Sequence, residues 1–150
     1  MVDESEIRAR PVVMAALLRQ GRLVHGVGLV FLVATLALAI GLALDGRLAG
    51  PAALLLGCGL LAGLGESWFA FRVALDADLF RRIGAGQLTL DGLDAALSGL
   101  GLLPQGKAGR PLDARMAGAK ALLAKQVGLA GLQLILLLAM LAILILRTPS

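Results

Sequence analysis

The sequence predicts an all-α membrane protein with three transmembrane helices: a helical hairpin, a cytoplasmic helical segment and a third long helix. Hydrophobic residues make up 59% of the 150 residues, more than a soluble domain of this size can hide from water. The run 127–146 contains twenty residues with no charge and one polar side chain, Gln133. That length of helix crosses the hydrocarbon core of a bilayer, where only a helix satisfies its own backbone hydrogen bonds.

Two earlier apolar stretches predict spans over about 23–44 and 50–71. The first carries only His25 and Thr35 as polar side chains. The connector Asp45-Gly46-Arg47 consists of residues that favour tight turns. We therefore expect these two spans to form a hairpin, and the expected segments of the chain are 1–22, 23–72, 73–126, 127–146 and an external tail at 147–150.

The region around the first span leaves alternatives open. Residues 11–20 predict a short helix that either lies in the membrane interface or extends the first span into the cytoplasm. The span could also be a secretory signal peptide cleaved at Ala37-Leu38-Ala39. Cleavage is less favoured because the apolar region continues past this triplet and because acidic residues, among them Asp3 and Glu4, precede it.

The distribution of Lys and Arg predicts the orientation. Four basic residues precede the first span and eight lie between the second and third, whereas the opposite side holds only Arg47 and Arg147. By the positive-inside rule, the N-terminus and the middle segment are cytoplasmic, and the C-terminus is external. The Ala-, Leu- and Arg-rich composition suggests a bacterial host, and therefore the bacterial inner membrane.

The polar segment 73–126 is expected to be helical, but with few leucines it buries too little area to fold alone. It should therefore cap the inner ends of the spans, either those of its own chain or those of a neighbour. The second helix is expected to continue to Ile83 and to stop at Gly84-Ala85-Gly86. A short helix should follow, with Asp91 as its N-cap and with breaks at Gly99-Leu100-Gly101 and Pro104-Gln105-Gly106. Pro111 should lie in the first turn of a long helix that continues to Leu146.

The charges of this segment bear on its partners. Arg115, Lys120 and Lys125 recur every five residues, which scatters them around the helix. A helix that binds nucleic acid needs a basic stripe with stacking aromatic side chains, and this pattern is absent. The expected partners are the lipid bilayer, anionic lipid headgroups, and other membrane-protein subunits or a second copy of the chain.

Glu66 is the strongest candidate for a functional side chain, because ionisable groups inside a span are costly. It lies six residues, or roughly 9 Å, from Arg72 along the helix. His25 lies near the same boundary on the antiparallel span, three residues after Arg22. A His25–Glu66 hydrogen bond is therefore expected, either for proton handling or as a purely structural pair. In another alternative, both side chains snorkel to the headgroups.

Other candidate residues concern packing and anchoring. Gly59 and Gly63 form a GxxxG pattern that lets helices approach closely, and Gln133 offers a hydrogen bond to another helix or copy. Trp68, Arg72 and Asp76 are spaced four apart, which permits a stacked and ion-paired column or an interfacial anchor.

Enzyme chemistry is disfavoured, and no cofactor is expected. One His and one Cys cannot form a conventional zinc site, and no phosphate-binding P-loop pattern occurs. The leading functional hypothesis is a small non-catalytic subunit, assembly factor or scaffold of a membrane complex. The alternatives are a homo-oligomeric channel or proton-coupled transporter that uses Glu66 and His25, and a holin-like permeabilising protein.

Overall fold

The computed structural model describes residues 4–101 and 109–147, and within these ranges the chain is helical and contains no strand. The helices are α1 (Glu4–Arg19), α2 (Gly21–Leu44), α3 (Gly50–Gly84), α4 (Leu90–Gly99) and α5 (Leu112–Arg147). Three helical stretches are long and apolar enough to cross a membrane, by length and composition: Ala9–Leu44, Gly50–Gly84 and Leu112–Leu146. The prediction of an all-helical chain with three such helices is confirmed.

Several helix ends follow the sequence signals. The turn after α2 places Gly46 at φ 67°, and the N–H of Arg47 donates to the carbonyl of Leu42 at 2.8 Å. The predicted stop after α3 is present, with Gly86 at φ 69°. Both positions need a left-handed backbone, which glycine adopts without strain.

Two predicted N-termini are wrong by one or two residues. Thr89, not Asp91, caps α4, because the Thr89 hydroxyl accepts the N–H of Gly92 at 3.1 Å and Asp91 lies in the first turn. Pro111 precedes the first turn of α5, since its carbonyl accepts the N–H of Arg115 at 3.3 Å. The predicted break at Pro104-Gln105-Gly106 lies outside the described residues.

The N-terminal helix is longer than residues 11–20, since α1 begins at Glu4 and contains Pro11. Only Gln20 separates α1 from α2, and its N–H donates to the carbonyl of Leu17 at 3.1 Å. The two helices belong to different compact units of the chain. Unit 1 comprises Met1–Gln20 and Arg72–Leu123, and unit 2 comprises Gly21–Phe71 and Ala124–Ser150.

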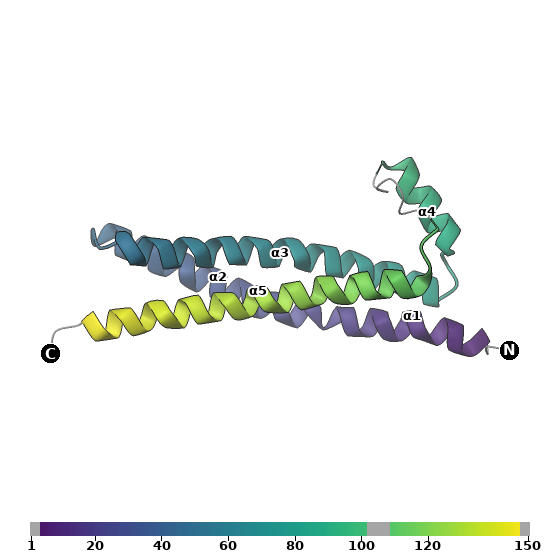
Figure 1. Ribbon diagram of the computed structural model, residues 1–150, viewed down its shortest axis with the longest axis horizontal. Coiled ribbons are helices and arrows are strands. Elements are labelled where there is room, and N and C mark those ends of the chain that lie inside the picture. The colour runs from purple at the N-terminus through teal and green to yellow at the C-terminus, as the bar shows by residue number, and fades with distance from the viewer. Residues whose placement is uncertain (1–3, 102–108, 148–150) are drawn as a thin grey trace. The chain divides into compact units, whose positions relative to one another are not determined.

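Unit 2 is a three-helix bundle made by α2, the first part of α3 and the last part of α5, which run alongside one another (Figure 1). Its buried residues recur every seven positions, the repeat of helices that supercoil around one another. In α2 they are Gly21, Gly28, Thr35 and Leu42, and in α5 they include Gln126, Gln133 and Met140. One end of this bundle is closed by an apolar cluster of Leu42, Leu56 and Met140.

Unit 1 has a core of its own, in which the first turns of α5 pack against α1 and the last turns of α3. The buried members are Met14, Ala15, Leu18, Val73, Ala77, Phe80 and Ala119. Helix α4 joins this unit through Asp94, which accepts hydrogen bonds from the Arg115 guanidinium at 2.6 Å and from the Gly109 N–H at 2.8 Å. These two donors lower the pKa of Asp94, with the Gly109 bond the larger cause.

Candidate functional site

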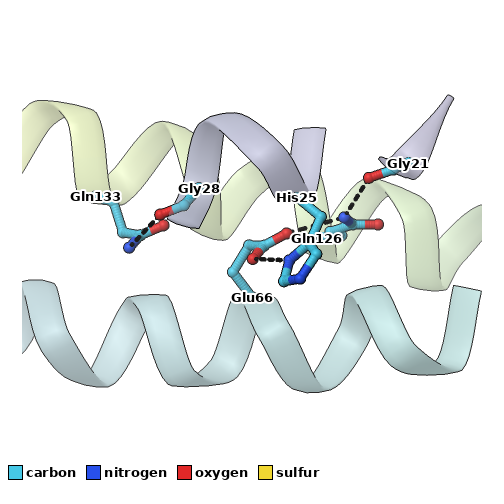
Figure 2. Close-up of polar contacts among 6 residues, drawn as sticks. All are labelled: Gly21, His25, Gly28, Glu66, Gln126 and Gln133. Atoms are coloured by element: carbon cyan, nitrogen blue, oxygen red, sulfur yellow. Dashed lines mark hydrogen bonds and ion pairs between the residues drawn. The ribbon is translucent and has the colours of Figure 1, made fainter. Parts of the chain in front are cut away.

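Glu66 lies at the centre of a polar network inside unit 2 (Figure 2). It is fully buried, and both carboxylate oxygens have partners from the other two helices of the bundle. Oε2 lies 3.0 Å from Nδ1 of His25 on α2, and Oε1 accepts a hydrogen bond from Nε2 of Gln126 on α5 at 2.9 Å. A single carboxylate therefore links all three helices of the bundle.

The hydrogen bond expected between His25 and Glu66 is present. The two helices run antiparallel, so a residue early in α2 meets a residue late in the unit 2 part of α3. The His25 side chain is 34% exposed, whereas that of Glu66 is almost completely buried. An ionised carboxylate accepts this bond only when the Nδ1 nitrogen carries the proton.

Gln126 is the member of the network that sequence reasoning missed. Its Nε2 donates to the Gly21 carbonyl at 2.8 Å and to Glu66 at 2.9 Å. Because both neighbours are acceptors, the amide must turn its NH₂ group toward them, and its buried Oε1 is left without a hydrogen-bond partner. The available signal was its spacing of seven residues from Gln133, which places both amides on one face of α5.

Gln133 forms the second polar layer of the bundle. Its Nε2 donates to the Gly28 carbonyl at 3.4 Å, a long bond, and its buried Oε1 has no hydrogen-bond partner. The sequence left open whether this amide bonds to another helix or to a second copy. Within the chain, its partner is α2.

The two glycines of the GxxxG pattern lie at close approaches of α3 to its neighbours. A Cβ atom at Gly63 would lie 2.4 Å from Nε2 of Gln133 and 2.7 Å from Cδ1 of Leu32. A Cβ atom at Gly59 would lie 3.2 Å from Cγ2 of Thr35. The pattern therefore packs α3 against both α2 and α5.

A third close approach supports the network directly. A Cβ atom at Gly28 would lie 2.9 Å from Oε2 of Glu66. The absence of a side chain at this position leaves room for the carboxylate between α2 and α3. Glycine is thus required here for space rather than for backbone conformation.

The stacked and ion-paired column that Trp68, Arg72 and Asp76 permit is not formed among the described residues, and their role as an interfacial anchor stays a prediction. Trp68 is 61% exposed. Arg72 and Asp76 form no salt bridge, although both lie in the described part of α3 and are one turn apart. The ring contact observed in this region instead places Nζ of Lys125 5.8 Å from the centroid of Phe69.

The arrangement offers no metal centre, since the described residues contain no group of three or more His, Cys, Asp or Glu side chains suited to an ion. Comparisons with protein-family models, with curated proteins and with solved structures found no match. The geometry of the bundle is therefore the basis for proposing a function.

Proposed function

We propose that the chain is a small, non-catalytic, multi-pass protein of the bacterial inner membrane that serves as a subunit, assembly factor or scaffold of a membrane complex. In this proposal the N-terminus is cytoplasmic and the C-terminus external, as the distribution of basic residues indicates. The three long apolar helices support membrane insertion.

The main support for this proposal is the bonding of the Glu66 carboxylate inside the bundle. Both of its oxygens contact side chains of the same bundle, one on α2 and one on α5, and the carboxylate is fully buried. A buried carboxylate that links three helices acts as an interhelical connection, in the way that polar groups hold transmembrane helices together.

The interior beyond the network also supports a structural role. Past Gln133, the next buried polar group is Thr35, whose hydroxyl donates to the Phe31 carbonyl of its own helix at 2.7 Å. The apolar cluster of Leu42, Leu56 and Met140 follows. Among its described residues, the buried polar groups of the bundle thus stop short of this apolar end, which supports a structural role over a channel or transporter.

The outward residues of the bundle suit lipid or a partner helix. Many of them are large and apolar, including Val30, Val33 and Ile135, each more than 60% exposed. Lipid tails stabilise such a surface as well as another subunit would, so the surface alone does not identify the partner. In this proposal, unit 1 meets anionic headgroups and cytoplasmic partners.

Proton handling remains the second candidate, because one observation favours it. The partly exposed His25 connects the buried Glu66 to the surface of the bundle. On this reading the His25–Glu66 pair would exchange protons with one side of the membrane. The apolar cluster at the end of the bundle argues against a complete pathway.

The test is purification of the wild-type chain and of Glu66→Gln from native membranes in mild detergent, followed by identification of bound proteins. The substitution keeps an acceptor for Gln126 and offers an NH₂ group to His25, whose Nδ1 can accept in the other tautomer. The proposal expects the same partners in stoichiometric amounts with both proteins. Recovery of the wild-type chain as a lone homo-oligomer would contradict it.

A further inference from the structure

Unit 1 contains an open apolar groove of about 290 Å³ between α1 and the start of α5. Ala9, Val13 and Leu17, spaced one turn apart, form the wall on α1, and Met116 contributes from α5. Met14 forms a buried floor, whereas Val13 is 67% exposed. The groove thus presents apolar surface that the described residues do not cover.

Two basic residues also line this groove, Arg10 on α1 and Lys120 on α5. The Arg10 guanidinium pairs with the Asp113 carboxylate, which fixes its position and leaves its other N–H groups available. Lys120 lies seven residues beyond Asp113, or about 10 Å along α5. It forms no ion pair or hydrogen bond with the rest of the described chain.

These features define the chemistry of the occupant. The groove is too small for a partner helix and lies just below the usual range of small-molecule pockets, so it suits one narrow apolar chain. None of the described residues that line it is aromatic, which disfavours a nucleotide base. The adjacent cations favour a ligand with a negative group next to its apolar part.

We propose that this groove binds one acyl chain of an anionic phospholipid, with the headgroup phosphate held by Lys120 and Arg10. The inference rests on the proposed membrane location, because it takes the lipid from the cytoplasmic leaflet beside unit 1. The proposed function includes only a general attraction between unit 1 and anionic headgroups, whereas the groove would be a specific, saturable lipid site that includes Lys120 and Arg10.

Native mass spectrometry of the full chain in detergent, titrated with phosphatidylglycerol or phosphatidylcholine, tests the proposal. We expect one phosphatidylglycerol to bind more tightly than phosphatidylcholine. Lys120→Gln should weaken phosphatidylglycerol binding about fivefold, the effect of one basic residue near an anionic lipid. Arg47→Gln, which removes an exposed charge outside unit 1, should leave binding unchanged.

A second pair of variants tests the apolar part of the site. Ala9→Phe places a ring in the groove and should abolish the saturable site, whereas Val12→Phe, at an exposed position outside the groove, should retain it. Equal binding of the two lipids, or equal effects within either variant pair, would overturn the proposal. Resistance of the chain to alkaline extraction from membranes tests the membrane location separately, so failure of the site and failure of the proposed function are distinguishable.

Discussion

Replacement of Gly63 by alanine should destabilise unit 2 by an amount that the structure lets us bracket. The added Cβ atom would meet Nε2 of Gln133 at 2.4 Å and Cδ1 of Leu32 at 2.7 Å, so side chains of two neighbouring helices must move. Overpacking of this kind costs about 1–3 kcal/mol. The higher helix propensity of alanine offsets roughly 0.5–1 kcal/mol of that cost.

Gly57→Ala provides the matched control, because a Cβ atom at Gly57 has nothing within 4 Å and the position lies on the same helix. Both variants gain the same propensity term, so the difference between them isolates the packing cost. Unfolding of the purified proteins in mixed micelles with increasing SDS should show Gly63→Ala less stable than Gly57→Ala by about 1–3 kcal/mol. Equal stability of the two variants would refute the inferred close packing of α3 against α2 and α5.

Three further predictions concern the network, α4 and the orientation. Gln126→Leu leaves Glu66 Oε1 and the Gly21 carbonyl without their donor and should lower the free energy of unfolding by about 1–2 kcal/mol. Gln87→Leu, at an exposed site, should leave the free energy of unfolding unchanged, and equal losses for the two variants in the SDS titration would count against the network. The pKa of Asp94 is lower in the folded state than in the unfolded state. Asp94 therefore stabilises the folded state above the ordinary carboxyl pKa, and this stabilisation is lost as the pH falls through the lowered folded-state pKa. Hydrogen-exchange protection of α4 should therefore fall in acid below about pH 4 in the wild type and in Asp91→Asn, and Asp94→Asn should show the reduced protection already at neutral pH; unchanged protection in Asp94→Asn would contradict this. A reporter active only outside the cytoplasm should be active when fused to the C-terminus and inactive at the N-terminus, and the reverse pattern would overturn the proposed orientation.

The long helices could be predicted because their signals are local. The uncharged run 127–146 and the turn at Gly46 each depend on neighbouring residues only. The His25–Glu66 contact could also be predicted, since both residues lie a few positions from basic residues at the same end of two antiparallel helices. Hairpin connectivity fixes the register of those helices to within about a turn.

Contacts of the third helix were harder to predict. The bonds of Gln126 to Gly21 and Glu66 depend on how far α5 slides and rotates against α2, which long-range packing determines. Its position beside Lys125 also makes Gln126 look like part of the polar segment. At α4, Thr89 and Asp91 are both good capping residues, and composition alone does not say which hydroxyl or carboxylate reaches a free N–H.

In the proposed function, Glu66 connects helices and does not carry ions. Proton flux into liposomes that contain the purified chain, under an imposed membrane potential, tests it most directly. We expect flux equal to that of empty liposomes for both the wild type and Glu66→Gln, because the polar interior ends at Leu42, Leu56 and Met140. Flux above that background in the wild type that is lost in Glu66→Gln would show instead that Glu66 carries protons.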